Sequence, residues 1–259
     1  MRPVRAAAVT ASLAGSLLIS GALSATAAAP TTIPVLNHTH RLHLNANQQS
    51  TNWSGWVNTS GGLGYTSASG TWTVPTVTPT SDDRYSSDWV GIGGDPSPDL
   101  IQAGTEQDSV GGNARYHAWY EVLPAPELQI TTMAVSAGDT MHVTLAESTP
   151  EVWTITLSDQ SNGGSFSTTI PYSSTFLTAE WIHEAVTVNG TVATLPITSN
   201  AHFDLGLANG QTIANAGGAQ SIQMFDSNNN PIATPSGLDS DGDGFAVADG
   251  GTAPSAPGS

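Results

Sequence analysis

The chain has 259 residues, no cysteine, no lysine and a formal net charge of −16 at pH 7. Without cysteine, the fold cannot use disulfides, thiol catalysis or zinc sites built on thiolates, and it must rest on packing alone. We expect no binding to nucleic acid or to an anionic membrane, because both require a basic surface. The lack of positive charge favours a protein adapted to acid, where protonated carboxylates leave little charge repulsion.

The first 29 residues are typical of a secretory signal peptide. Arg2 and Arg5 precede an apolar, alanine-rich run, and Ala25-Thr26-Ala27 matches the small-x-small cleavage pattern. No later stretch is apolar over the length that a bilayer span needs. The sequence therefore predicts a secreted, extracellular protein that keeps no membrane attachment once the signal peptide is cleaved.

Residues 30–50 are predicted to be a leader or a short propeptide. They are polar, interrupted by two prolines, and contain three of the seven histidines, His38, His40 and His43. These histidines would gain charge as the pH falls, which suits a propeptide. A flexible tail is the alternative, and the histidine spacing alone does not predict a metal site.

Short β-type runs alternate with Gly, Asn, Ser and Pro turns from residue 51 to residue 249. Predicted strands cover residues 54–58, 70–74, 88–92, 116–122, 128–135, 140–147, 151–157, 174–184, 202–208, 220–226 and 244–249. Many short strands at spacings near ten residues, without helical periodicity, predict one all-β domain, a sandwich or a barrel. Residues 250–259 are predicted to be a flexible tail.

The segment AEWIHE, at residues 179–184, is a candidate for chemistry. Read as a strand, it carries Glu180 and Glu184 on one face and Trp181, expected in the core, on the other. These glutamates are then about 13 Å apart, beyond the ~5–9.5 Å of a glycosidase pair. A glycosidase would have to recruit a carboxylate from a neighbouring strand, with Glu121, Glu106 and Asp88 as candidates. No Gly-x-Ser-x-Gly motif supports a serine hydrolase.

Aromatic residues and glycines gather between Trp89 and Pro124, where Gln102 also lies in an apolar setting. On a secreted surface such a composition suggests that a ligand lies against the rings. One alternative is therefore a non-catalytic carbohydrate-binding β-sandwich, with Trp89, Trp119 and Tyr120 as a stacking platform.

Seven short motifs resemble, in content and order, those of the glutamic peptidases, also called eqolisins. They are NWSGWV (52–57), GTWTVP (70–75), DWVGIGG (88–94), LIQAG (100–104), YHAWYEVLP (116–124), GDTMHV (138–143) and AEWIHE (179–184). The likeness covers about residues 52–248. It implies a concanavalin A or legume-lectin-like sandwich of two antiparallel sheets, and a bacterial-type secreted endopeptidase active in acid. It also implies protein or peptide substrates and no metal or cofactor, and we expect a monomer.

The resemblance assigns the catalytic pair to Gln102 and Glu180. Glu180 would activate water and then protonate the leaving amine, while Gln102 would stabilise the oxyanion; Glu184 is the main rival for the base. A carboxylate near its reference pKa of about 4 can stay ionised in acid, where a histidine base would be protonated. The residues expected to line the substrate cleft are Trp89, Tyr120, Trp53 and Gly55.

The sequence departs from the family at two positions beside these motifs. Gly93 stands where family members commonly have Asp, and Glu106 replaces an Asp often found after the glutamine. The first change removes a carboxylate that we expect to support the site, and the second is milder.

A calcium loop is a further possibility in LDSDGDGF, residues 238–245. Asp239, Asp241 and Asp243 occupy the alternate positions of such a loop, and Gly244 its sixth position. The glutamate of the twelfth position is missing, since residue 250 is Gly. We therefore expect no metal, while leaving calcium open.

Overall fold

The computed structural model describes residues 34–43 and 48–259. The predicted signal peptide, residues 1–29, lies outside the described residues. Every regular element among the described residues is a β-strand. None of the described segments forms a helix with the length and apolar character that a membrane crossing would require.

The longer strands carry the two layers of the fold. They are β3 (Trp53–Thr59), β4 (Ser67–Thr73), β6 (Ser87–Gly93), β7 (Leu100–Val110), β8 (Asn113–Val122), β9 (Leu128–Ile130), β10 (Thr140–Thr149), β11 (Val152–Asp159), β12 (Ser165–Pro171), β13 (Thr178–Glu184), β17 (Ala201–Ala208), β19 (Gly218–Phe225), β20 (Pro231–Pro235) and β21 (Phe245–Asp249). The two-residue strands are β1 (Leu36–Asn37), β2 (Gln49–Ser50), β5 (Val77–Thr78), β14 (Thr187–Val188), β15 (Thr191–Val192), β16 (Ile197–Thr198) and β18 (Gln211–Thr212).

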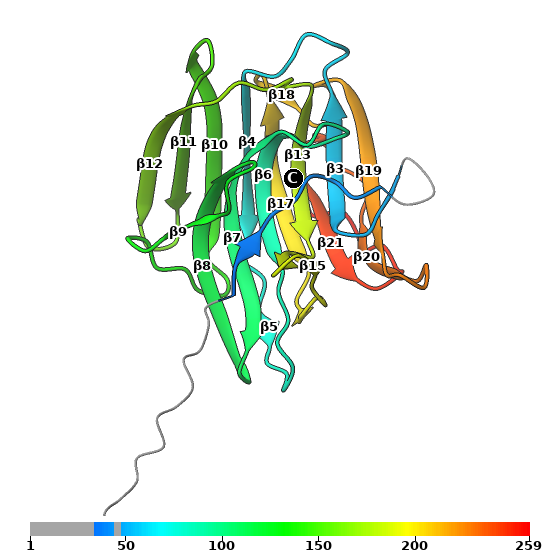
Figure 1. The fold of residues 1–259 in the computed structure, drawn as a ribbon. Helices are drawn as coiled ribbons and strands as arrows, with labels where there is room; N and C mark the ends of the chain where they lie inside the picture. The colour runs from blue at the N-terminus through cyan, green and yellow to red at the C-terminus, as the bar shows by residue number, and fades with distance from the viewer. Residues whose placement is uncertain (1–33, 44–47) are drawn as a thin grey trace, which may run out of the picture. The chain divides into compact units, whose positions relative to one another are not determined.

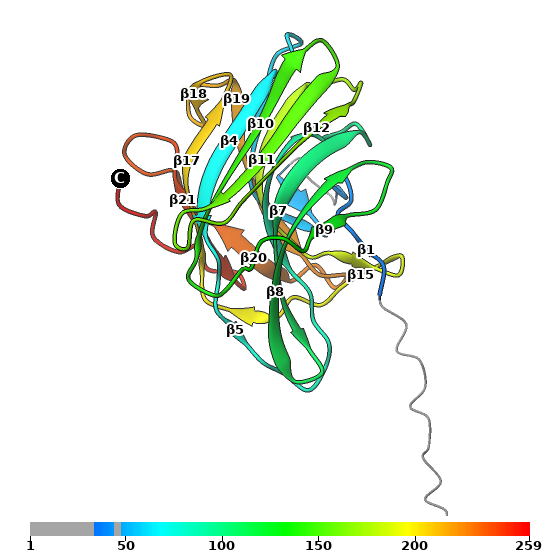
Figure 2. The same cartoon turned by 90° about the vertical axis from the view of Figure 1, so that its left-hand side faces the viewer.

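Two antiparallel layers face each other, as Figures 1 and 2 show. The front layer has the order β19-β3-β13-β6-β7-β8-β9, and the back layer has the order β12-β11-β10-β4-β17-β21-β20. The pairing of β19 with β20 connects the two layers, so that their strands form one continuous sheet that folds over on itself. The predicted all-β sandwich is confirmed.

The main hydrophobic core lies between the layers. Val90 and Trp181 of the front layer and Val143 and Phe203 of the back layer belong to one buried cluster. The Trp181 indole N–H also donates to the carbonyl of Ser69 across the two layers, at 2.8 Å. The prediction that Trp181 belongs to the core is therefore confirmed.

The outer face of the front layer is also buried. A second apolar cluster lies on it and consists of Trp53, Val57, Trp89, Leu100, Trp119, Ile182 and Ile222. Residues 34–43, here called the docked leader, run across this face in front of β6 and β13 (Figure 1). Their β1 strand pairs with β14 at one end, and the Arg41 amide donates to the carbonyl of Gly94 at the other.

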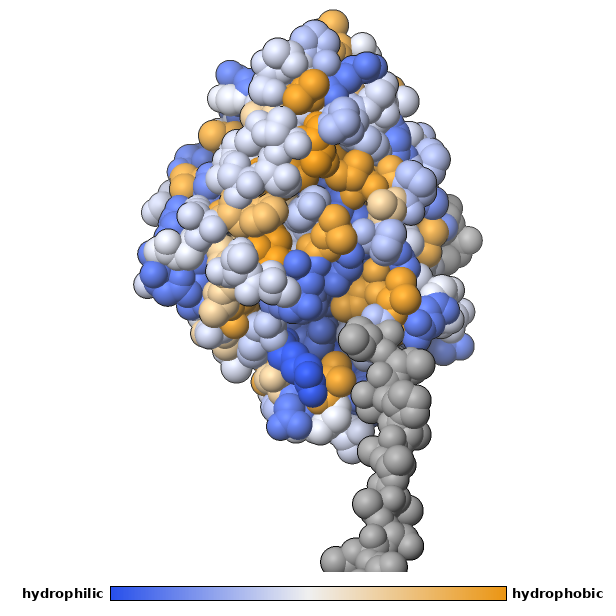
Figure 3. All heavy atoms as spheres, turned by 60° about the vertical axis from the view of Figure 1, so that its left-hand side comes forward, coloured by the Kyte–Doolittle hydropathy of each residue, from blue (hydrophilic) through white to orange (hydrophobic). Residues whose placement is uncertain are grey.

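Few large apolar side chains of the described residues are exposed. They are Val35, Leu63, Leu128, Leu177, Ile197 and Leu205. On the face drawn in Figure 3, apolar side chains form small patches separated by polar ones. Isolated apolar side chains of this kind are usual at protein surfaces and call for no partner.

Candidate functional site

Strand register brings the polar residues of the front layer onto its outer face, here called the site face. One row across β13, β6, β7 and β8 consists of Glu180, Gly91, Gln102 and Glu121, and another of Glu184, Ser87, Glu106 and His117. The row between them consists of Ile182, Trp89, Gly104 and Trp119. Side chains alternate along a strand, so these three rows share one face.

Two glycines let the Trp89 indole lie flat on the site face. A Cβ at Gly91 would lie 2.6 Å from the Trp89 ring, and a Cβ at Gly104 would lie 2.5 Å from the Trp89 Cβ. Held in this way, the indole N–H donates to Oε2 of Glu184 at 2.8 Å. Trp89 therefore orients the Glu184 carboxylate.

Gln102 is completely buried and points its amide nitrogen at the docked leader. Nε2 donates to Oε2 of Glu121 at 2.8 Å and to the backbone carbonyl of His38 at 3.3 Å. Burial raises the pKa of Glu121 to about 8, so this carboxyl is neutral in acid. A neutral neighbour leaves the amide donor of Gln102 available over the whole acid range.

Glu184 is the carboxylate that meets the docked leader. Its Oε1 accepts a hydrogen bond from the Thr39 amide at 3.2 Å, and its Oε2 lies 3.1 Å from Nδ1 of His38. Glu184 and Gln102 thus contact opposite ends of one peptide bond, the bond between His38 and Thr39.

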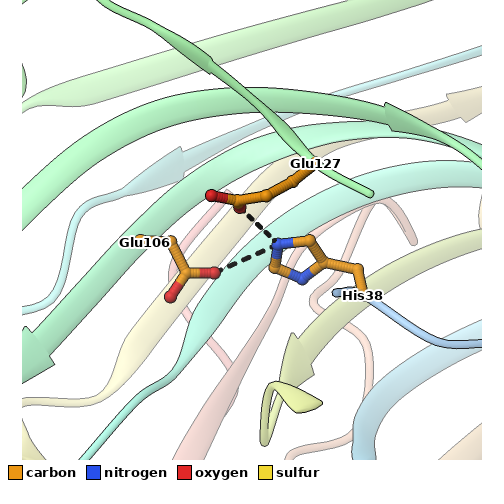
Figure 4. Close-up of side chains that lie close together, drawn as sticks. All are labelled: His38, Glu106 and Glu127. Atoms are coloured by element: carbon orange, nitrogen blue, oxygen red, sulfur yellow. Dashed lines mark hydrogen bonds and ion pairs between the residues drawn. The ribbon is translucent and has the colours of Figure 1, made fainter. Parts of the chain in front are cut away.

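The His38 side chain fills a buried pocket on the site face. Its ring stacks on Trp119 with a centroid distance of 3.5 Å and an interplanar angle of 5°. Its Nε2 lies 3.1 Å from Glu106 and 3.0 Å from Glu127, as Figure 4 shows. Burial lowers the pKa of His38, but the hydrogen bonds to Glu106, Glu127 and Glu184 outweigh it and raise the pKa well above its usual value.

Two clusters of the described residues have donor atoms close enough to hold a metal ion. The first consists of His38, Glu106 and Glu127, and the atoms lie within 4.8 Å of one another. A histidine ligand must be neutral, whereas the raised pKa of His38 favours its charged form in acid. The residues therefore fit an ion pair better than a metal in acid.

The second cluster bears on the predicted calcium loop. It joins Asp239 and Asp243 to Asp204 of β17, while Asp241 is exposed and not part of it. Oδ1 of Asp239 accepts hydrogen bonds from the amides of Asp243 and Gly244, which stabilises the turn without a cation. Calcium binding here stays a prediction, with a donor set different from the one expected.

The assignment of Glu180 as partner of Gln102 is not supported by this geometry. Both residues lie on the site face, but Gly91 stands between them in the row and the Trp89 ring covers it. Among the described residues neither oxygen of the Glu180 carboxylate has a hydrogen-bond partner. The rival candidate, Glu184, is the glutamate that reaches the same peptide bond as Gln102.

Glu180 should instead make the stability of the fold depend on pH. Burial raises its pKa well above the usual value. A raised folded-state pKa gives stability that is present below the unfolded pKa of about 4.3 and is lost as the pH rises through the folded pKa. We expect Glu180→Gln, which cannot ionise, to gain stability over the wild type from pH 4 to pH 8, by about 1.4 kcal/mol per unit of pKa shift.

Urea unfolding at pH 4, 6 and 8 measures this effect. Glu147→Gln is the control, since Glu147 is partly exposed and its amide replacement can still accept the Glu151 N–H. Parallel pH profiles for the wild type and Glu180→Gln would contradict the burial of an ionisable carboxyl at position 180.

The four residues expected to line the cleft lie in different environments in the structure. Trp53 lies on the site face, donates from its indole N–H to the carbonyl of Thr39 at 3.1 Å, and packs edge-on against Trp89. Gly55 is an interior strand residue whose missing Cβ lets β3 approach the Trp181 carbonyl closely. Its contact is with the backbone of β13, which gives it a packing role.

Tyr120 does not belong to the cleft, contrary to the prediction. Strand alternation directs Trp119 and Glu121 to the site face and Tyr120 to the opposite one, where it packs against the main core. Its ring stacks on Phe166 of β12 with centroids 5.5 Å apart.

Gly93 has a conformational reason for departing from the family pattern. Its φ is 95°, in the left-handed region that favours glycine. A Cβ at this position would also collide with the carbonyl oxygen of Asp99. An aspartate could not occupy this backbone without a shift, so the site of this chain is built without that carboxylate.

The structure removes Asp88 from the glycosidase candidates and leaves Glu106 and Glu121 on the site face, and it removes the expected stacking platform for a sugar. Asp88, a candidate for a glycosidase pair, faces the interior and pairs with His183 at 2.8 Å, away from the site face. Trp89 and Trp119 are fully buried and Tyr120 lies on the other face, so these rings do not form a platform for a sugar.

Thr39 and Glu127 are site residues that the sequence did not indicate. Glu127 lies between β8 and β9 in a Pro-rich connection, where no pattern links it to Gln102. His38 was noted for its charge change, but only the docking of residues 34–43 brings it to Glu184. The sequence offers Glu121 only as a glycosidase carboxylate, and Glu106 both in that role and as the replacement of an Asp that follows the glutamine in the family.

Comparisons with known proteins identify the family of this chain. The sequence model of the Peptidase A4 family matches residues 51–244. Aspergillopepsin-2 from Aspergillus niger is 29% identical over 161 residues, which is 53% of this chain and 56% of that protein. The chain therefore spans little more than half the length of this relative.

Solved structures with the same fold include three peptidases. Scytalido-glutamic peptidase with a transition state analog inhibitor superposes with a TM-score of 0.63 at 21% identity, covering 77% of this chain and 98% of that one. SCP-B, an eqolisin in complex with the tripeptide Ala-Ile-His, gives 0.60 at 21% identity with the same coverage. Aspergilloglutamic peptidase from Aspergillus niger gives 0.56 at 21% identity, covering 64% and 99%.

Proposed function

Because the chain belongs to the peptidase A4 family, we propose that it is an acid endopeptidase that hydrolyses peptide bonds through Gln102 and Glu184. One observation carries the proposal: the His38–Thr39 peptide bond lies between these two side chains. Its carbonyl oxygen accepts from the Gln102 amide, and its N–H donates to the Glu184 carboxylate. The pair differs from the one expected from the sequence only in the glutamate.

In the proposed reaction Glu184 is the general base and then the general acid. It removes a proton from a water molecule that attacks the carbonyl carbon, and it returns that proton to the leaving nitrogen. Gln102 donates a hydrogen bond to the oxyanion of the tetrahedral intermediate, a contribution worth about 3–4 kcal/mol. Trp89 orients the carboxylate, and the hydrogen bond to Glu121 orients the amide of Gln102.

The substrates we propose are protein or peptide chains that cross the site face in an extended conformation. The docked leader takes this path and uses backbone hydrogen bonds at both ends. The complex of SCP-B with the tripeptide Ala-Ile-His supports a peptide ligand for the family fold. Secretion and a monomeric state stay predictions, since they depend on residues and contacts outside the described structure.

Digestion of a denatured protein at about pH 4, where a carboxylate base can ionise, tests the function. We expect cleavage that persists with EDTA and with an inhibitor of pepsin-type aspartic peptidases. Loss with EDTA would favour a metal at His38, Glu106 and Glu127, and loss with the second inhibitor would favour a pair of aspartates. Either loss, or no cleavage at all, would overturn the proposed mechanism.

A further inference from the structure

We propose that the His38–Thr39 bond is itself a substrate: the protein removes its own leader by hydrolysing this bond. In this arrangement Trp119, Glu106 and Glu127 form the subsite for the residue that precedes the cut, and a histidine side chain is its preferred occupant. The inference rests on the proposed function and adds to it a specific bond and a specific side chain.

The docked leader is bound as a substrate would be. Leu36 and Asn37 pair with β14 as an added antiparallel strand, the mode by which many proteins bind extended peptides. Beyond the bond, the Arg41 amide donates to Gly94 at 3.0 Å, and the Arg41 side chain pairs with Asp95 at 2.8 Å. The chain is thus held on both sides of residues 38 and 39.

Backbone contacts of residues 38 and 39 align the docked leader so that one peptide bond lies between Gln102 and Glu184. The amide of His38 donates to Glu121 at 3.1 Å and its carbonyl accepts from Gln102 at 3.3 Å. The next amide, that of Thr39, donates to Glu184 at 3.2 Å. One bond further along, the carbonyl of Thr39 accepts from the Trp53 indole N–H at 3.1 Å instead. Within residues 34–43, only the bond between residues 38 and 39 meets both Gln102 and Glu184.

The pocket around His38 is specific for a flat, cationic side chain. The ring stacks on Trp119. Its Nε2 lies between Glu106 and Glu127, as Figure 4 shows. Burial opposes ionisation of Glu127, but hydrogen bonds from His117 and His38 outweigh it and lower the pKa of Glu127 to about 2. The pair of an imidazolium with an anionic Glu127 therefore persists at pH 4.

Hydrolysis of this bond needs no reagent besides water. The water oxygen forms a bond to the carbonyl carbon of His38 while one proton passes to Glu184. The bond from that carbon to the Thr39 nitrogen then breaks, and Glu184 delivers the proton to the nitrogen. The products are a carboxylic acid at His38 and an amine at Thr39, or the carboxylate and ammonium after one proton passes between them.

The two products of the cleavage differ in the contacts that hold them to the rest of the protein. Residues from Thr39 onward stay attached through Trp53, Asn52 and the ion pair of Arg41 with Asp95. The segment that ends at His38 loses its covalent link to the rest of the chain. Its described residues are then held by the short pairing of β1, two hydrogen bonds between Val35 and Asn189, the packing of Leu36 and the contacts of His38 itself. Cleavage would therefore release the N-terminal segment and empty the Trp119 pocket for another peptide.

The test is to shift the purified full chain to pH 4 and follow it by intact mass spectrometry and N-terminal sequencing. The wild type should yield a new N-terminus at Thr39, reading THRLH. Glu184→Gln should keep its leader, and Glu180→Gln should cleave like the wild type. A rate that does not change over a 100-fold dilution would identify cleavage within one molecule.

Variants of the leader test the subsite. His38→Ala should slow the cut at this bond at least 10-fold, because it loses the stacking on Trp119, the ion pair with Glu127 and the contact with Glu106. His40→Ala is the matched control and should cleave normally, since the described contacts of His40 involve only its backbone. Equal rates for His38→Ala and the wild type would overturn the assigned subsite.

Digestion of a denatured protein in the same samples separates the two proposals. If that substrate is cut while the 38–39 bond stays intact or the leader is cut elsewhere, self-cleavage at His38 is refuted and the peptidase function stands. In that case the docked leader acts only as an inhibitor. If neither substrate is cut, the peptidase function fails and the inference fails with it.

Discussion

Replacing Glu184 by Gln should lower kcat/KM for a peptide substrate by about 10³- to 10⁴-fold at pH 4, the contribution of a positioned general base. Gln has the same shape, and its one oxygen can still accept from either Trp89 or Thr39, which donate to different oxygens of Glu184. The other contacts of a bound peptide are untouched, so most of the binding should be preserved. It cannot take a proton from water or return one to the leaving nitrogen. The loss should therefore fall on kcat, with KM changed little.

Glu180→Gln is the matched control for this experiment. It makes the same substitution on the same strand and the same face, four residues away. Because the Trp89 ring separates it from Gln102, we expect kcat/KM within about threefold of the wild type, a difference below ~1 kcal/mol. A collapse of activity in Glu180→Gln together with full activity in Glu184→Gln would restore the assignment from the sequence motif.

The sequence could not separate the two glutamates, for a physical reason. In AEWIHE both side chains point to the same face, so alternation along β13 gives each the same access to a cleft. What distinguishes them is the Trp89 ring, which donates to Glu184 and covers Gly91 beside Glu180. That arrangement depends on two glycines from neighbouring strands and cannot be read from β13 alone.

The strand that carries Gln102 was missed for a related reason. β7 is the longest of the described strands, but the sequence LIQAGTEQDSV lacks the alternation of apolar and polar residues. Its polar side chains are buried on both faces: Gln102 and Glu106 lie on the site face, and Thr105 and Gln107 lie on the other. Ile101 and Ala103 enter the main core on that second face. Burial of both faces removes the pattern by which a half-exposed strand is recognised.

Other strands were predictable because they face water on one side. β10 and β11 alternate between buried and partly exposed residues, and their predicted ranges agree with the structure within a few residues. Residues 131–135 and 174–177 were predicted as strand but form turns and loops beside β9 and β13. Their β-branched and aromatic composition favours strand, but no neighbouring strand pairs with them.

Replacing Gln102 by Ala should lower kcat by about 10²- to 10³-fold, because the amide is the donor to the developing oxyanion. In the docked leader this donor is 3.3 Å from the carbonyl oxygen, a loose contact that would tighten as negative charge forms on the oxygen. The interaction is thus stronger in the transition state than in the bound substrate, so KM should change little.

Stopped assays of peptide hydrolysis and of leader cleavage should report the same loss, since both reactions use the same donor. Gln129→Ala, on an exposed position of β9, is the control and should leave both rates unchanged. A Gln102→Ala variant that raises KM but keeps kcat would mean that the amide only binds substrate. The oxyanion would then need a different donor, and the pairing of Gln102 with Glu184 would lose its chemical basis.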